Sequence, residues 1–236
     1  MVEMQNPATY QPNPTVLSAL QNITLVAIVG PSGSGKTTLV KLATEQDPGL
    51  HVVISDVSRP KRPEEQEGVD YFFRDKQSML EAIERQEYAQ VAPSNSGDIY
   101  ASHVESYTTD GTALITVWAD AMPVFRALPF KRLRTVFIVP ASYEAWQAHL
   151  GLHGFDETLR AKRLSEAERS LRFALEDPEV ELLVNDDLAQ ATIDLLAIVH
   201  RPPNEPMPDQ SKARQVVQNI LDHLVGNAFN ITHKGD

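Results

Sequence analysis

The sequence predicts an α/β fold built on a parallel sheet, and three observations support this prediction. A glycine-rich loop at residues 30–38 directly follows the apolar run at residues 23–29. Further apolar runs of strand length recur along the chain, and helix-compatible sequence follows several of them. Alternating buried strands and helices are typical of a parallel sheet with helices on its faces. We therefore expect the loop where the first strand passes into a helix.

The loop matches the pattern G-x-x-x-x-G-K-[ST]. This pattern needs glycines because the backbone adopts positive φ and comes close to phosphate oxygens. Its lysine lies along the β- and γ-phosphates, its hydroxyl residue holds Mg²⁺, and the helix N-terminus favours negative charge. We therefore predict Mg²⁺ at Thr37 and a nucleotide phosphate site formed by Gly30, Pro31, Ser32, Gly33, Ser34, Gly35, Lys36, Thr37 and Thr38. The alternative is a glycine-serine turn with a surface lysine.

The composition limits the possible function classes. The 236 residues suffice for one well-packed α/β domain, and a net charge of -11 argues against a general nucleic-acid binder. The absence of cysteine excludes disulfides, thiol nucleophiles and thiolate zinc sites. No apolar run approaches the ~20 residues of a membrane span, and the N-terminus does not resemble a secretory signal. We therefore expect a cytoplasmic protein without a membrane partner.

Apolar periodicity predicts the remaining elements in order. Short apolar runs indicate strands, and a recurrence of apolar residues every three or four positions indicates amphipathic helices. We expect strands at 23–29, 51–55, 113–118, 134–139 and 180–184, and helices after the loop, at 78–90 and at 157–177 with Asp156 as a possible N-cap. This succession is consistent with one α/β domain over residues 22–200.

The two ends of the chain have a different character. Residues 1–21 are polar and contain three prolines, so we expect a flexible leader. Residues 201–208 contain four prolines, and an amphipathic segment follows at about 216–224. The tail at 201–236 therefore either packs on the core or contacts a partner protein or a second copy of the chain.

A second group of residues follows the strand expected at 51–55. Arg59 and Arg62 are three residues apart, each stands beside a proline, and Gly68 and Tyr71 follow them. Arginine suits a phosphate because its planar guanidinium donates two parallel hydrogen bonds and keeps its charge. Prolines stiffen the segment. The alternative is a solvated polar loop.

The loop and this segment together resemble the guanylate kinase family. That family's GMP-binding segment runs roughly S-x-x-[ST]-R-x-x-R-x-x-E-x-x-G-x-x-Y-x-F, and the residues in register are Ser55, Ser58, Arg59, Arg62, Glu65, Gly68, Tyr71 and Phe73. The resemblance extends from about residue 23 to about 199, including Arg163-Leu164 and residues 184–188. It implies a P-loop parallel-sheet core with an inserted GMP-binding domain at about 56–110 and a short lid at about 149–160.

The resemblance also implies an activity. It is the transfer of the γ-phosphoryl group of ATP, with Mg²⁺, to a nucleoside monophosphate, in the first place GMP. Lys36 would bridge the migrating group and Arg163 would bind charge from both substrates. The acceptor phosphate would be held by Arg59, Arg62 and Tyr71, with Ser55 contacting it or its neighbouring groups.

Several positions differ from the family pattern. Gln90 stands where the family has a base-reading Glu, and Tyr100-Ala101-Ser102 replaces Tyr-Gly-Ser or Tyr-Gly-Thr, so that Ser102 is kept. We place Gln90 and Ser102 in the substrate site. On the third core strand, Thr116-Val117-Trp118 replaces D-x-D, and Asp120 matches only after a shift.

The lid also differs from the family. His149 and His153 stand where the family has arginines, which leaves phosphate clamping to Arg163 with Arg160. Histidine is mostly neutral at pH 7. The two histidines are interpreted as surface residues of a variable loop, with a metal or proton-transfer role as the alternative.

Three functions remain open from the sequence. The first is a nucleoside monophosphate kinase acting on GMP, and the second is a related kinase with another acceptor, either a different nucleotide or a ribose phosphate. The third is a catalytically weak binding module of the same family. Lys36 and Thr37 favour the kinases, because binding modules of this type typically lose these loop residues.

Overall fold

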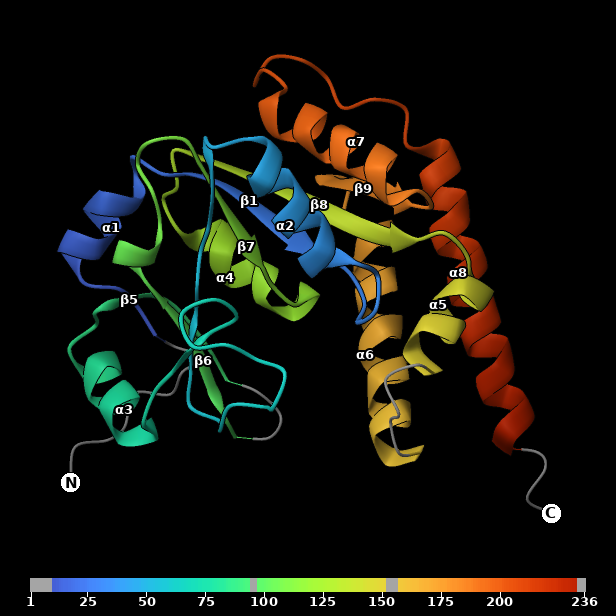
Figure 1. The fold of residues 1–236 in the computed structure, drawn as a ribbon, viewed down its shortest axis with the longest axis horizontal. Coiled ribbons are helices and arrows are strands. Elements are labelled where there is room, and N and C mark those ends of the chain that lie inside the picture. The colour runs from blue at the N-terminus through green and yellow to red at the C-terminus, as the bar shows by residue number, and fades with distance from the viewer. Residues whose placement is uncertain (1–9, 94–96, 152–156, 233–236) are drawn as a thin grey trace. The chain divides into compact units, whose positions relative to one another are not determined.

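The computed structural model describes residues 10–93, 97–151 and 157–232 (Figure 1). Backbone contacts divide the chain into two compact units. Unit 1 comprises Met1–Leu25, Pro48–Ile115 and Ala121–Leu133, and unit 2 comprises Val26–Asp47, Thr116–Asp120 and Arg134–Asp236. The glycine-rich loop belongs to unit 2 and the arginine segment to unit 1.

A five-stranded sheet has the order β2-β7-β1-β8-β9. The strands are β1 (Thr24–Val29), β2 (Leu50–Val52), β7 (Thr112–Thr116), β8 (Arg132–Pro140) and β9 (Val180–Asn185). Leu50 lies opposite Thr112 in the parallel pair β2–β7, and Thr135 lies opposite Val180 in the parallel pair β8–β9. The predicted parallel sheet is confirmed. β2 and β7 end earlier than expected, which leaves Trp118 outside the strand.

Helices pack around the strands of unit 2. They are α2 (Lys36–Gln46), α5 (Tyr143–Gly151), α6 (Glu157–Glu176), α7 (Leu188–His200) and α8 (Ser211–Thr232). α2 buries Leu39, Val40 and Ala43 and contacts α7. The Asp187 side chain caps α7 by accepting a hydrogen bond from Gln190 N at 2.9 Å. Among the described residues, no helix is long and apolar enough to cross a membrane.

Unit 1 contains a second sheet with the order β4-β3-β6-β5. Its strands are β3 (Asp56–Val57), β4 (Phe72–Phe73), β5 (Tyr88–Pro93) and β6 (Ile99–His103), and its helices are α1 (Pro14–Leu20), α3 (Lys76–Glu84) and α4 (Met122–Ala127). Short 3₁₀ turns occupy Val104–Ser106 and Ala119–Ala121, the second largely in unit 2. Met79 and Ile83 of α3 pack in one buried cluster with Ile99 and Ala101 of β6. Because side chains alternate along a strand, Tyr100 and Ser102 project to the other face.

The helix predicted over residues 78–90 is too long. α3 ends at Glu84, Arg85 is its C-cap, and Gln86 has a φ of +56°. A positive φ cannot continue a right-handed helix, and the chain turns there into β5. Residues 88–90 are therefore strand, and Gln90 lies opposite Ser102 on β6.

The described part of the N-terminal leader is ordered. Asn13 caps α1 by accepting a hydrogen bond from Val16 N at 3.0 Å, and Leu20 is fully buried. Tyr10 belongs to the cluster under the second sheet and donates to the Tyr88 carbonyl at 2.6 Å. Prolines do not prevent this helix because Pro14 occupies its first position. The flexible leader predicted over residues 1–21 therefore does not describe residues 10–20.

The C-terminal tail packs on unit 2. α8 contacts α6, β9 and α5, and it lies beside α6 in Figure 1. Val217, Ile220 and Leu224 are buried. Gln210 Oε1 accepts from Leu182 N on the edge strand β9 at 2.6 Å, and Arg214 donates to the Leu175 carbonyl at 2.8 Å. Of the alternatives left by the sequence, the structure therefore supports docking on the core.

We expect Ile220→Ala to lower the free energy of unfolding by about 2–4 kcal/mol, because it removes buried methyl groups from the α8 contact. Gln215→Ala, at an exposed position of the same helix, should change it by less than about 0.5 kcal/mol. Urea denaturation of the full chain measures both. Equal and small losses would show that α8 does not contribute to the folded core.

Candidate functional site: a phosphate-binding loop and an arginine segment

The glycine-rich loop adopts the backbone conformation that its sequence predicts. Gly30, Gly33 and Gly35 have φ values of +145°, +81° and +90°. Gly35 is the N-cap of α2, and its carbonyl accepts from Leu39 N at 2.9 Å. The loop therefore lies at the N-terminus of a helix, where the helix dipole favours bound phosphate.

At two of these glycines an added side chain would clash with a neighbouring group. A Cβ at Gly30 would lie 2.6 Å from the Ile138 carbonyl oxygen, and a Cβ at Gly35 would lie 2.3 Å from Asn185 Nδ2. Both distances are far below van der Waals contact. The glycines are therefore required by close packing as well as by φ.

Two side chains from distant elements hold the loop in place. Asn185, at the end of β9, donates from Nδ2 to the Ser34 carbonyl at 2.9 Å. Trp146 of α5 is buried and donates from Nε1 to the Ser32 carbonyl at 2.7 Å. Neither residue is assigned a role from the sequence, because no local motif marks Trp146 and Asn185 belongs only to the family resemblance.

Lys36 and Arg163 both contact the loop. Lys36 Nζ donates to the carbonyls of Gly30 at 2.7 Å and Pro31 at 2.8 Å. Burial, assisted by the nearby Arg163, lowers the pKa of Lys36 to about 8. Arg163 of α6 donates from Nη1 to Ser32 Oγ at 3.2 Å and to Glu166 at 3.1 Å. The structure therefore brings together the two residues predicted to be catalytic.

The loop residues also fit a magnesium-bound nucleotide phosphate. Thr37 and Thr38 are exposed at the start of α2, and Ser34 is buried with no hydrogen bond to its hydroxyl within the described part of the chain. Mg²⁺ in nucleotide sites takes many of its ligands from phosphate and water. One protein hydroxyl at Thr37, next to bound phosphates, therefore suits this ion.

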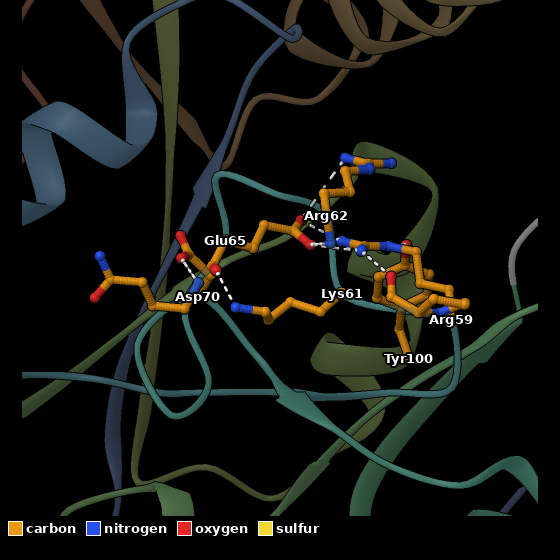
Figure 2. A network of polar contacts seen from close by, with 8 residues as sticks. Arg59, Lys61, Arg62, Glu65, Asp70 and Tyr100 are labelled. Carbon is orange, nitrogen blue, oxygen red and sulfur yellow. Dashed lines mark hydrogen bonds and ion pairs between the residues drawn. The ribbon is translucent and has the colours of Figure 1, made fainter.

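In unit 1, Glu65 organises the arginine segment (Figure 2). Arg59 donates to both carboxylate oxygens of Glu65, at 2.5 and 2.7 Å. Arg59 also donates from Nε to Tyr100 OH at 3.1 Å, and its guanidinium lies 5.2 Å from the Tyr71 ring centre. These bonds hold the pKa of Glu65 below its usual range and raise that of Arg59. Glu65 was in register with the family pattern but was given no role.

The Arg62 side chain is more exposed and less tightly bonded than that of Arg59. Its backbone N–H donates to Glu65 at 2.9 Å, but its guanidinium is only 3.8 Å from that carboxylate and its side chain is 51% exposed. Tyr71 is half-buried, and burial raises the pKa of its phenol, which therefore stays protonated as a donor. Ser55 precedes β3, and its carbonyl accepts from Phe72 N at 2.9 Å. Arg62 therefore has the more exposed side chain of the two arginines.

Gln90 and Ser102, both predicted for the substrate site, are neighbours. Gln90 Nε2 donates to Ser102 Oγ at 3.4 Å, and Ser102 Oγ shares a 2.7 Å hydrogen bond with Tyr107 OH. All three residues are buried. Tyr107 had not been identified from the sequence, because it lies beyond the 3₁₀ turn and outside the quoted motif.

The remaining candidates have other contacts or cannot be placed. Asp120 forms a 3.4 Å ion pair with Arg169 at the surface, and Trp118 is 44% exposed. His149 lies in the last turn of α5. His153, the N-cap predicted at Asp156 and the middle of the predicted lid lie outside the described residues.

Comparison with known proteins points to one family. The protein-family model for guanylate kinase matches residues 22–201. A guanylate kinase of Symbiobacterium thermophilum is 32% identical over 183 residues, covering 74% of this chain and 83% of that protein. A guanylate kinase of Pseudomonas fluorescens is 30% identical over 209 residues, covering 86% and 97%. The crystal structure of guanylate kinase from Anaplasma phagocytophilum has the same fold, with a TM-score of 0.57 and 19% identity over 75% of this chain and 84% of that one.

Gly35→Ala should weaken binding of Mg·ATP by roughly 10- to 100-fold, because the new Cβ strains the loop and displaces Asn185. Titration calorimetry measures the affinity. Gly97→Ala is the matched control, since Gly97 has a φ of +79° but no atom of the described residues lies within 4 Å of its Cβ position. The same loss in both variants would mean that positive φ alone, and not the packing of the loop, decides the effect.

The affinity for Mg·ATP should fall as pH rises above about 8, the pKa of Lys36 in the free protein. Bound phosphates favour the charged ammonium, so they raise this pKa, and the complex holds the proton more tightly than the free protein does. Affinity is then constant below pH 8 and decreases by up to about tenfold per pH unit above it. Calorimetric titrations from pH 7 to 9.5 test this. Lys36→Met should bind more weakly and lose this pH dependence, and a wild-type affinity independent of pH would contradict the prediction.

Proposed function

The chain belongs to the guanylate kinase family, and from that premise we propose that it transfers the γ-phosphoryl group of ATP to a nucleoside monophosphate, with GMP as the expected acceptor. The braced phosphate-binding loop with Lys36 and Arg163 at its surface carries this proposal. Asn185 and Trp146 hold the backbone in the conformation that receives phosphates.

The donor side uses positive charge and backbone groups. Lys36 would exchange its bonds to the Gly30 and Pro31 carbonyls for bonds to the β- and γ-phosphates, which takes its ammonium out of an unfavourable environment. Arg163 would donate to the migrating group. Thr37 would hold Mg²⁺, which would supply positive charge to the phosphates.

The acceptor side uses the arginine segment. Arg62 and Tyr71 would donate to the acceptor phosphate, and Arg59 would add its remaining N–H while Glu65 fixes its orientation. Ser55 would contact the phosphate or its neighbouring groups. Phosphoryl transfer needs positioning and cations more than covalent chemistry, so the proposal requires no general base.

The base would be read by the neighbouring pair of Gln90 and Ser102. A kinase with another acceptor remains the second candidate, because Gln90 is a neutral amide that can donate as well as accept. A binding module without catalysis would not need Lys36 and Arg163 to meet at the loop. We therefore place the catalytic proposal first.

A coupled assay of ADP release from Mg·ATP, with a panel of nucleoside monophosphates and ribose phosphates, tests the proposal. Lys36→Ala should lower kcat by about 10²-fold or more, because it removes a cation from the transferring group.

Arg62→Ala should raise KM for the acceptor about tenfold or more and leave the affinity for ATP unchanged.

Arg85→Ala is the matched control for Arg62, since Arg85 is an exposed arginine of unit 1 that pairs with Glu87. It should leave both constants unchanged. No turnover of any acceptor despite ATP binding would overturn the proposed function. Equal losses of acceptor and ATP binding in Arg62→Ala would overturn the assignment of the arginine segment.

A further inference from the structure

A buried amide in unit 1 has an acceptor atom without a partner. Gln90 is 5% exposed, and its Oε1 accepts no hydrogen bond within the described part of the chain. Leaving such an atom buried and unpaired is energetically unfavourable. An acceptor atom that finds no donor within the fold is suited to a ligand that supplies an N–H donor.

The groups around this atom are neutral. Gln90 Nε2 makes only a long 3.4 Å bond to Ser102 Oγ, and Ser102 shares its other bond with Tyr107 OH. Burial raises the pKa of Tyr107, so its phenol keeps its proton at neutral pH. Among the described residues, no carboxylate bonds to any of these three side chains. They therefore offer a ligand one unmet acceptor and two unused donors, an amide N–H and a hydroxyl, without negative charge.

This arrangement matches the edge of a 6-oxopurine. Position 1 of such a base carries an N–H, and the neighbouring position 6 carries a carbonyl oxygen. The amide oxygen of Gln90 can accept from the N–H while an amide N–H or a hydroxyl donates to the carbonyl. A 2-amino group adds another donor, for which a carboxylate has a second acceptor oxygen but the amide of Gln90 has none.

We propose that the chain phosphorylates inosine monophosphate (IMP) as well as GMP, because its base-reading group does not depend on the 2-amino group. This inference rests on the proposed kinase function. In the step, an oxygen of the IMP phosphate forms a P–O bond to the γ-phosphorus of ATP, and the bond from that phosphorus to the β–γ bridging oxygen breaks. The products are ADP and inosine diphosphate, and no electron carrier takes part.

The wild-type chain tests the inference in a coupled assay with GMP and IMP as acceptors. We expect values of kcat/KM for GMP and IMP within about tenfold of each other, since one additional neutral contact is worth little. GMP turnover with rejection of IMP by more than about 100-fold would overturn the inference but leave the proposed function intact.

Gln90→Glu tests whether Gln90 contacts the base. Its carboxylate can accept from the N–H and the 2-amino group together, so we expect the GMP-to-IMP ratio of kcat/KM to rise about tenfold or more. Gln215→Glu makes the same chemical change at an exposed position of α8 and should leave the ratio unchanged. An unchanged ratio in Gln90→Glu would show that Gln90 does not face the base.

Direct measurement of binding separates the proposed recognition of the base from the proposed kinase activity. Titration calorimetry of GMP and IMP with the wild-type chain needs no turnover and no variant that must fold. Similar affinities support the reading of the base without its 2-amino group even if every acceptor proves inactive, an outcome that would remove the proposed function and with it the phosphorylation of IMP. Binding of GMP more than about 100-fold tighter than IMP contradicts the inference in either case.

Discussion

The close packing around the phosphate-binding loop is the constraint on which the rest of the structure depends. A carbonyl of β8 and the amide of Asn185 come so near to Gly30 and Gly35 that a Cβ at either position would clash. The same neighbours hold the loop, because Asn185 and Trp146 donate to its carbonyls. Since Trp146 lies on α5 and α5 contacts α8, the C-terminal helix supports the element that braces the loop. A residue far from the phosphates thus contributes to their site through rigid packing.

The two candidate phosphate-binding regions differ in the contacts that their cations make before a ligand binds. Lys36 donates to two carbonyls of the loop, and burial lowers its pKa, which disfavours the charged ammonium. Bound phosphate would favour the charged form again. Arg59 is already paired with Glu65 and Tyr100, which fixes its direction and leaves few of its donors available. Arg62 keeps its guanidinium exposed. We therefore regard Arg59 as the residue that shapes the segment and Arg62 as the one that meets the anion.

Local chemistry explains which features could be predicted from the sequence. The loop, its strand and α2 follow from a dense glycine pattern between apolar runs, and Arg59 and Arg62 follow from their spacing. The helix at 78–90 was predicted too long because its apolar pattern continues, whereas the backbone reverses at Gln86. The roles of Trp146 and Tyr107 could not be predicted, because they arise from contacts that only the tertiary structure creates. The same holds for the ion pair of Glu65 with Arg59. The packing of α8 was one of two alternatives, since an amphipathic face does not identify what covers it.

The most direct test is a crystal structure of the chain with Mg²⁺ and a bisubstrate analogue in which adenosine and guanosine are joined through five phosphates. We expect the adenosine-side phosphates to contact the backbone of residues 33–37, and Lys36 Nζ to leave the Gly30 and Pro31 carbonyls for phosphate oxygens. We expect the guanosine-side phosphate to contact Arg62 and Tyr71. Phosphates bound away from the loop, with Lys36 still bonded to the two carbonyls, would rule out this arrangement.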